Sequence, residues 1–155
     1  MLRRLPALVT AAAALAAGTA VSAAGPAAAA APSTPCATAA SVVRIDGLAF
    51  DPPSVAPGGT SAATLTATNC TGRALTLGTT WSGRFLSDTS SGIPAGCPAV
   101  DPLPRPVTFA PHERVSVTTG YLVLAGCTAD RLRLTVTLSR DGVALAGRTA
   151  DLLID

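Results

Sequence analysis

The sequence predicts an all-β fold, an antiparallel sandwich of about seven strands held by two disulfides. Three observations support this prediction. Apolar and polar residues alternate over several segments of roughly ten residues, which is the period of a strand with one face in a core. From Ser41 onward, Gly, Pro, Asn and Asp interrupt the chain about every ten to fifteen residues, as turns do. No stretch repeats its apolar residues with the period of about 3.6 that an amphipathic helix requires.

The chain begins with the pattern of a bacterial export signal. Two arginines in Met1–Arg4 precede an uncharged apolar run, Leu5–Val21, and the small residues Ser22–Ala24 follow. This order predicts a signal peptide at residues 1–24 that is cleaved near its end, so we expect a secreted, extracellular protein. The alternative, a retained membrane helix, is disfavoured because the run is Ala-rich, short for a membrane span and without a basic flank.

The segments after the signal have different compositions. Residues 25–40 consist mainly of Ala, Pro, Ser and Thr, with no charge and no large side chain, so we expect a flexible linker. Residues 41–155 are long enough for one hydrophobic core, and we expect a single domain there. Without Arg3 and Arg4, nine arginines balance nine acidic residues. A nucleic-acid partner is therefore not expected, since binding needs a basic patch.

Three of the predicted strands lie in the first half of the domain. Val42–Phe50 is apolar at alternate positions, with a shift of phase at Gly47. Thr60–Asn69 alternates small apolar residues with threonines, and Arg73–Trp81 places its leucines and Trp81 on one face. That phase favours Trp81 as a core residue rather than as a stacking platform for a sugar.

Four more predicted strands complete the domain. Val107–Phe109 is short, Arg114–Leu124 alternates apolar with polar residues, and Arg131–Ser139 alternates most regularly. An Asp-Gly pair then predicts a tight hairpin turn into Val143–Ile154, whose change of phase predicts a bulge near Gly147. Seven short strands with these turns favour an Ig-like antiparallel β-sandwich.

Each of the four cysteines falls between predicted strands. They are Cys36, Cys70, Cys97 and Cys127. An exported chain without Cys-x-x-Cys spacing favours disulfides over a metal site. In a seven-stranded Greek-key sandwich, the start of the first strand and the second connection share one end. The third and fifth connections share the other end. The strand order therefore predicts the pairs Cys36–Cys70 and Cys97–Cys127.

An antibody-like pairing is the main alternative. A Cys70–Cys127 bridge would imitate the inter-sheet disulfide of antibody domains, with Trp81 packed against it. Both cysteines lie in turn-like sequences, however, and Tyr121 stands six residues before Cys127 instead of two. We therefore favour one disulfide at each end.

Two segments resemble known families. Asp51–Thr60 (DPPSVAPGGT), followed by Leu65–Asn69 (LTATN), resembles the opening of bacterial extracellular Ig-like modules, in particular the cell-adhesion-related domain found in bacteria. This resemblance implies a sandwich used in adhesion, spacing or binding, and carries over no functional residue. Cys97–Pro102 (CPAVDP), with Cys127 thirty residues later, resembles the reactive loop of secreted subtilisin inhibitors of actinobacteria. That resemblance implies a protease-binding loop, although a structural turn is the favoured interpretation.

No catalytic, cofactor-binding or metal-binding residue is predicted, so we do not expect an enzyme. His112 and Glu113 are the only histidine and glutamate, and they lie in a predicted turn without the second histidine of a zinc-protease helix. The candidate contact surface consists instead of connection residues, namely Asp88, Pro98, Val100, Pro104 and Arg105. Pro104 and Pro106 have a second, favoured interpretation, because prolines protect an edge strand from pairing.

Together these observations predict a secreted, non-catalytic Ig-like domain that acts as an extracellular binding or structural module. We expect it to be a monomer that recognises a protein or cell-wall ligand, without membrane attachment after signal cleavage. The alternative is a secreted protease inhibitor that presents the Cys97 loop.

Overall fold

The computed structural model describes Cys36 and residues 41–89, 91–100 and 102–155. The expected signal peptide and, apart from Cys36, the expected linker lie outside the described residues. The described residues belong to one unit, Thr34–Asp155, and they form strands and turns without a helix. No helix long and apolar enough to cross a membrane occurs among them.

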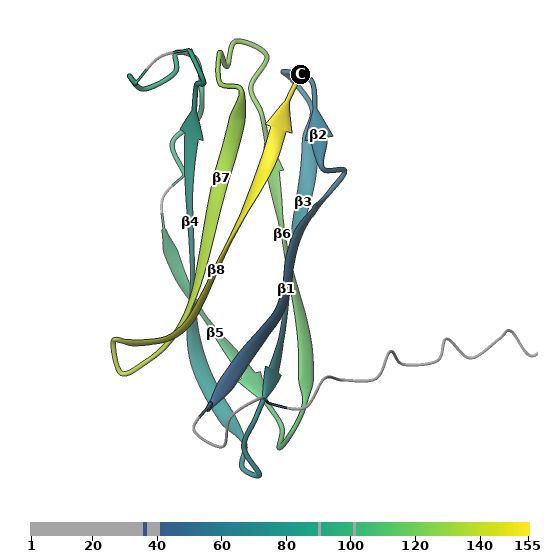
Figure 1. The fold of residues 1–155 in the computed structure, drawn as a ribbon, viewed down its shortest axis with the longest axis vertical. Helices are drawn as coiled ribbons and strands as arrows, with labels where there is room; N and C mark the ends of the chain where they lie inside the picture. The colour runs from purple at the N-terminus through teal and green to yellow at the C-terminus, as the bar shows by residue number, and fades with distance from the viewer. Residues whose placement is uncertain (1–35, 37–40, 90, 101) are drawn as a thin grey trace, which may run out of the picture. The chain divides into compact units, whose positions relative to one another are not determined.

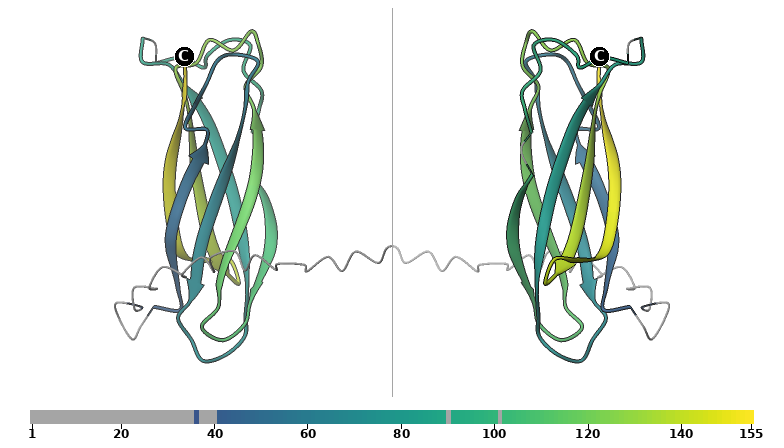
Figure 2. Two further views of the ribbon diagram at one scale, coloured as in Figure 1. Left: turned by 90° about the vertical axis from the view of Figure 1, so that its right-hand side faces the viewer. Right: turned by 90° about the vertical axis from the view of Figure 1, so that its left-hand side faces the viewer.

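Eight strands form two sheets that pack face to face (Figures 1 and 2). The smaller sheet has the order β1-β3-β6 and the larger has the order β2-β8-β7-β4-β5. Neighbouring strands are antiparallel except β2, which runs parallel to β8. The strands are β1 (Val43–Asp51), β2 (Ser54–Val55), β3 (Thr60–Asn69), β4 (Leu75–Leu86), β5 (Leu103–Phe109), β6 (Arg114–Leu122), β7 (Arg131–Arg140) and β8 (Val143–Ile154).

All seven predicted strands are present, but the number and some of the bounds were wrong. β2 is an additional strand, and its two residues are too few for any alternation to appear. β4 continues to Leu86, and β5 begins at Leu103 rather than at Val107. The predicted strand began four residues too late because Pro104 and Pro106 argued against a strand there. An edge strand tolerates such prolines, and β5 pairs only with β4.

The two predicted irregularities have different outcomes. The β1–β3 register shifts between Ile45 and Gly47, as the phase change at Gly47 predicts. In the β7–β8 pair, Leu138 lies opposite Ala146 and Ser139 lies opposite Ala144. The extra residue is therefore Leu145, so the prediction of a bulge near Gly147 was two residues too late.

The inward residues of both sheets form one hydrophobic core. Trp81 is buried within it, as its phase predicts, and β7 contributes an unbroken row of fully buried apolar side chains. The largest fully buried apolar residues are Phe109, Leu65, Leu77, Leu132, Leu134, Leu138 and Leu152. A dense core of this kind makes the two sheets a stable support for the connections at either end.

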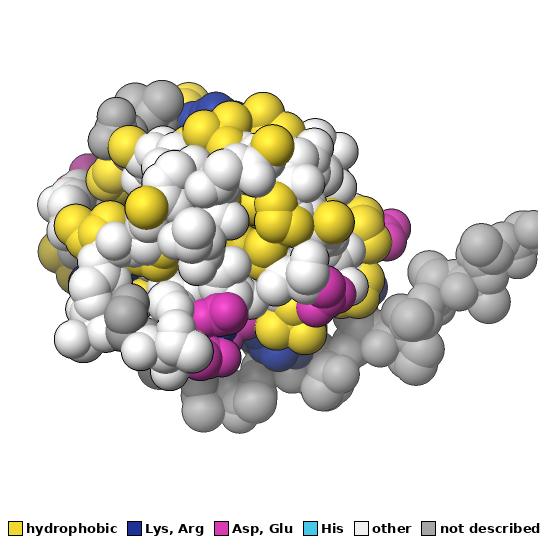
Figure 3. Space-filling view, turned by 90° about the horizontal axis from the view of Figure 1, so that it is seen from above, with side chains coloured by type: hydrophobic (Ala, Val, Ile, Leu, Met, Phe, Trp, Pro, Cys, Tyr) yellow, Lys and Arg dark blue, Asp and Glu magenta, His cyan; other side chains and the backbone are white. Residues whose placement is uncertain are grey.

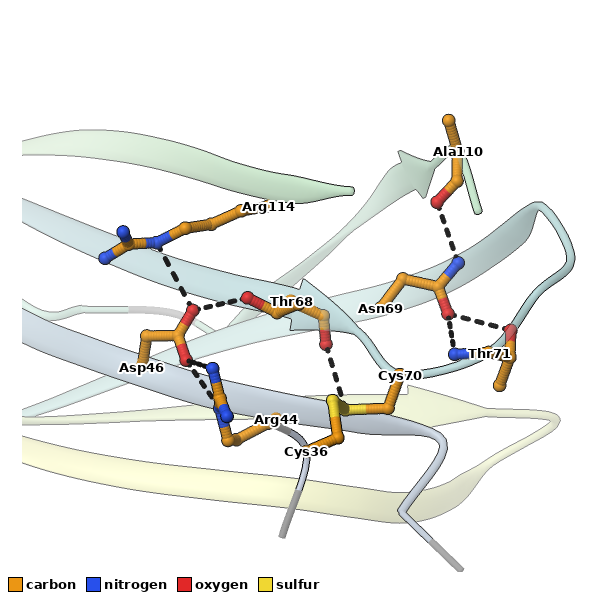
Figure 4. The surroundings of a disulfide bond; sticks show 9 residues. All are labelled: Cys36, Arg44, Asp46, Thr68, Asn69, Cys70, Thr71, Ala110 and Arg114. Carbon is orange, nitrogen blue, oxygen red and sulfur yellow. Dashed lines mark hydrogen bonds and ion pairs between the residues drawn. A yellow bond between two sulfur atoms is a disulfide. The ribbon is translucent and has the colours of Figure 1, made fainter. Parts of the chain in front are cut away.

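The disulfides link Cys36 to Cys70 and Cys97 to Cys127, the pairs that the strand order predicts. Cys70, which Figure 4 shows bonded to Cys36, directly follows β3. Its backbone N–H donates to the carbonyl of Val42 just before β1. Cys97 and Cys127 lie instead in the connections that follow β4 and β6. One disulfide therefore lies at each end of the two sheets. We call the two ends the Cys36 end and the Cys97 end.

Two polar groups stabilise the Cys36 end (Figure 4). The Asp46 carboxylate accepts hydrogen bonds from Arg44 and Thr68 and pairs with Arg114, so it joins all three strands of the smaller sheet. Burial acts to raise the pKa of Asp46, but these hydrogen bonds and arginine charges outweigh it and hold the pKa below its ordinary value. The second group is the fully buried Asn69.

Candidate functional site

The Cys97 end is built from two connections, residues 87–102 between β4 and β5 and residues 123–130 between β6 and β7 (Figure 1, top). The Cα atoms of Cys97 and Cys127 are 4.2 Å apart across the disulfide. Beside the bridge, the Thr128 N–H donates to the Ala95 carbonyl at 3.0 Å. The Ala95 N–H donates in return to Thr128 Oγ1 at 3.1 Å. Covalent and hydrogen bonds therefore hold the two connections together.

Gly96 is required where these connections approach each other. Its φ of +68° lies in the left-handed region that favours glycine. A Cβ atom at this position would lie 2.0 Å from the carbonyl oxygen of Gly126. Glycine at position 96 thus allows the two backbones to come close enough for the neighbouring disulfide.

Asp130 fixes the beginning of the longer connection. Its carboxylate accepts hydrogen bonds from the Asp88 N–H and from the Ser87 hydroxyl. The Asp130 N–H donates to the carbonyl of Leu86, and Arg131 forms an ion pair with Asp88 at 2.6 Å. The hydrogen bonds from Asp88 and then Ser87 lower the pKa of Asp130 below its ordinary value.

We expect this carboxylate to make the Cys97 end sensitive to acid. Because the pKa of Asp130 is lower in the folded than in the unfolded chain, its stabilising contribution is present near neutral pH. That contribution is lost as the pH falls through the folded pKa. Asp130→Asn should therefore lower the melting temperature at pH 7 and reduce the drop in melting temperature between about pH 5 and pH 2.

Circular dichroism melting curves across this pH range would measure the effect. Asp141→Asn, in the exposed turn between β7 and β8, is the matched control and should leave the pH 7 melting temperature nearly unchanged. If the melting temperature of Asp130→Asn fell between about pH 5 and pH 2 as much as that of the wild type, the assigned role of Asp130 would be contradicted.

Ile93 is the most exposed large apolar residue described, with 91% of its surface accessible. It lies at the Cys97 end between Gly92 and Pro94, and Pro94 is buried. Figure 3 looks down on this end and shows apolar side chains spread across it. The chain therefore anchors the residue after Ile93 while it presents the isoleucine itself to solvent.

A hollow of about 380 Å³ lies beside Ile93. Its lining is mostly apolar, with Arg84 as the one charged residue, and consists of Gly83, Arg84, Phe85, Ile93, Cys97, Pro98, Ala99 and Val100. The exposed side chain can insert into a pocket of a partner, and the apolar hollow beside it can receive a side chain of that partner.

The structure brings only some of the predicted contact residues to this end. Asp88 is exposed and paired with Arg131, and Pro98 lines the hollow. Val100 is only partly accessible, because it packs on Gly83, where an added Cβ would lie 2.9 Å from Val100 Cγ1. Val100 therefore has a packing role as well as a place in the lining.

Pro104 and Arg105 lie elsewhere, in the edge strand β5, opposite Thr80 and Thr79. The Arg105 carbonyl accepts a hydrogen bond from Thr79 at 2.7 Å. Both residues line a separate hollow of about 330 Å³ that reaches the β7–β8 turn. They are thus strand residues rather than members of an extended loop, which agrees with the edge-protecting interpretation.

His112 and Glu113 occupy the turn between β5 and β6. Glu113 accepts a hydrogen bond from the Ala110 N–H, and the His112 N–H donates to the Thr71 carbonyl. Among the described residues, no three or more His, Cys, Asp or Glu side chains are grouped as metal ligands.

Sequence reasoning did not select Ile93 as a contact residue. The available signal was its position as the one large apolar residue in the small, polar segment Ser87–Gly96. An isolated apolar residue has no period, so the sequence could not show whether it turns inward or outward.

Comparisons with known proteins show likeness of fold only. No family model and no curated protein matches the chain. The alkylpurine DNA glycosylase AlkC of Pseudomonas fluorescens, solved with DNA containing an abasic site analogue, has a TM-score of 0.52 and 13% identity. The sporulation control protein Spo0M of Bacillus subtilis has a TM-score of 0.50 and 11% identity. Each match covers 74% of this chain, but only 30% of the AlkC chain and 49% of the Spo0M chain.

Proposed function

We propose that the chain is a secreted, non-catalytic Ig-like module that binds an extracellular protein or cell-wall ligand through its Cys97 end. The observation that carries this proposal is the 91% exposure of Ile93 on a connection fixed by a disulfide. The two disulfides also fit an oxidising environment outside the cell.

The strand order supports the Ig-like assignment. If β2 is set aside, the chain has seven strands. The first, second and fifth of these (β1, β3 and β6) form one sheet, and the third, sixth and seventh (β4, β7 and β8) lie together in the other. Ig constant-type domains group these six strands in the same way. The remaining strand, β5, pairs with β4 rather than with β6, and this is the point of departure from the constant type.

The physical argument for binding concerns order and exposure. A fully buried isoleucine side chain contributes roughly 1.5–3 kcal/mol relative to an exposed one. In a flexible loop, the entropy lost when the loop becomes ordered on binding would offset much of this contribution. The Cys97–Cys127 bridge and the Asp130 hydrogen bonds order the connection in advance. Ile93 is therefore suited to insert into an apolar pocket of a partner.

We expect Ile93→Asp to reduce partner retention at least tenfold, because binding would then bury an unpaired charge. The probe is the biotin-labelled secreted chain, incubated with the extracellular medium and with the cell-wall fraction of the producing organism. Quantitative mass spectrometry of the retained proteins, together with the fraction of probe bound to the wall, gives the readout.

Val143→Asp is the matched control, because Val143 is 63% exposed beside the β7–β8 turn, away from the connections of the Cys97 end. It should retain the wild-type partners. Equal retention by wild type and Ile93→Asp, or an equal loss in Val143→Asp, would reject the assigned surface.

The second candidate function is protease inhibition by the same end. It is favoured by the way the Cys97–Cys127 bridge and the Ala95–Thr128 hydrogen bonds fix an exposed loop. Titration of subtilisin-like and trypsin-like proteases distinguishes it from the first proposal. Stoichiometric inhibition would support the inhibitor, whereas rapid cleavage within residues 87–102 without inhibition would reject it.

A further inference from the structure

β6 has an open hydrogen-bonding edge. It lies at the margin of the smaller sheet, where it pairs with β3 on one side only (Figure 2). Its nine residues pair with β3 without a register shift, from Thr68 opposite Arg114 to Thr60 opposite Leu122. The other side of β6 is thus an edge without a bulge along the length that pairs with β3.

Hydrogen bonds just beyond the two ends of β6 show which of its residues turn their backbone outward. The Asn69 N–H donates to the Glu113 carbonyl, and the Val123 N–H donates to the Gly59 carbonyl. These directly opposed pairs place the odd-numbered residues in the hydrogen-bonded positions toward β3. The even-numbered residues of β6 therefore direct their N–H and C=O groups to the open edge. These are Arg114, Ser116, Thr118, Gly120 and Leu122.

The other edge strands carry features that oppose pairing with another chain. β1 contains a bulge, and β5 contains two prolines. β2 has only two residues. Charged residues, bulges, prolines and shortness are the devices by which proteins protect sheet edges. β6 has no proline and no bulge, and its one charged residue, Arg114, is paired with Asp46.

The inner face of β6 is also incompletely covered. None of its side chains is buried, whereas every other strand longer than two residues has at least one buried side chain in the described part of the chain. Val115, Val117 and Tyr121 point inward but stay partly accessible. A strand added beside β6 would shield these apolar side chains in addition to forming backbone hydrogen bonds.

We propose that β6 pairs antiparallel with β6 of a second copy of the chain, so that the smaller sheet continues across a two-fold axis. Full overlap places Thr118 opposite Thr118 of the second copy and Ser116 opposite Gly120. Arg114 then lies opposite Leu122. In this register all five outward residues fall in hydrogen-bonded pairs, which gives about ten backbone hydrogen bonds between the copies. This dimer replaces the monomer expected from the sequence.

The side chains and charges of β6 suit a second copy of the same strand. The two arginines would lie at opposite ends of the paired strands, about 27 Å apart from the rise per residue, well beyond the screening length of about 8 Å. The arginines and acidic residues after residue 24 balance, so the copies carry no net repulsion. Thr64–Thr118 and Thr66–Ser116 hydroxyl pairs already cross from β3 to β6, and a Thr118–Thr118 pair would continue that ladder.

The segment before Cys36 is a poorer occupant of the same edge. Pro26, Pro32 and Pro35 lack the N–H groups that a paired strand must donate. A second β6 offers the complete row of donors and acceptors.

Sedimentation equilibrium of the secreted, disulfide-bonded chain tests the proposal over concentrations from about 1 µM to 500 µM. We expect the average mass to rise with concentration toward twice the monomer mass. Thr118→Lys places two like charges opposite each other at the axis and should weaken dimerisation at least tenfold. An equimolar mixture of Thr118→Lys and Thr118→Glu should dimerise again.

Thr64→Lys is the matched control, because it breaks the same hydroxyl pair and adds the same charge one strand away from the edge. It should dimerise like the wild type. Thr118→Pro removes only an outward N–H and should also be monomeric, with an unchanged circular dichroism spectrum. A monomer mass at every wild-type concentration, or equal dimerisation of the Thr118→Lys and Thr64→Lys variants, would overturn the proposal.

The dimer and the binding function can fail independently. Ile93 lies outside β6, in the connection that follows β4, so Ile93→Asp should leave the mass distribution unchanged. Thr118→Pro should conversely keep partner retention within about twofold of the wild-type value. The only loss expected is the avidity that the two copies of the wild-type dimer provide.

Discussion

Replacement of Cys97 and Cys127 together by serine is expected to lower the free energy of unfolding by about 3–4 kcal/mol. The bridge closes a loop with a sequence separation of 30 residues, and the chain-entropy relation gives this magnitude for such a loop. Small domains are stable by only about 5–15 kcal/mol, so the variant would lose a large part of its stability. Only hydrogen bonds, those between Ala95 and Thr128 and those that Asp130 accepts from Ser87 and Asp88, would then hold the two connections together.

Urea unfolding at pH 7, followed by circular dichroism, measures this change. The matched variant replaces Cys36 and Cys70, whose sequence separation of 34 predicts a loss of similar size. The two variants should differ in function, because removal of the Cys97 bridge alone should reduce Ile93-dependent retention. A loss below about 1 kcal/mol in the Cys97 and Cys127 variant would show that the bridge does not constrain the unfolded chain as the relation assumes.

Asn69→Ala should lower the free energy of unfolding by about 3 kcal/mol, because it leaves several backbone groups without their partner. The Asn69 amide donates to the carbonyls of Arg73 and Ala110 at 2.7 and 2.8 Å. Its carbonyl oxygen accepts from the backbone N–H and the hydroxyl of Thr71 at 2.9 and 2.8 Å (Figure 4). One buried side chain thus joins the end of β3 to the connections before β4 and β6.

Thr71→Ala provides the comparison for this prediction. It removes one hydrogen bond to Asn69 but leaves the two amide–carbonyl bonds in place, so we expect a loss of about 1 kcal/mol or less. Both variants can be measured by urea unfolding. Equal losses in the two variants would mean that the amide contacts of Asn69 contribute little.

Strand positions were predictable because the alternation of apolar and polar residues shows which side chains of a strand point into the core. Arg131–Ser139 shows this most simply, since its apolar positions became the fully buried row of β7. The disulfide pairs followed from the order of the strands, because that order decides which connections share an end. β2 was not predictable, since two residues carry no period and its parallel partner β8 lies about a hundred residues away in sequence.

The candidate site was predictable only in part. The cysteines located the Cys97 end, but the orientation of single loop residues depends on contacts between distant segments. Val100 and Ile93 illustrate this limit. Both are apolar residues in the same connection, yet Val100 packs on Gly83 whereas Ile93 is exposed. The open edge of β6 likewise required the strand order, because Arg114–Leu122 has the same alternation as a central strand.

Hydrogen–deuterium exchange of the chain, free and bound to the protein or wall fraction that it retains, tests the proposed binding surface most directly. We predict slower exchange on binding in peptides that cover Ser91–Cys97, with no change in the β7–β8 turn at Asp141–Gly142. Slower exchange at that turn or along β5, with none at Ser91–Cys97, would contradict the proposal that the Cys97 end recognises the partner.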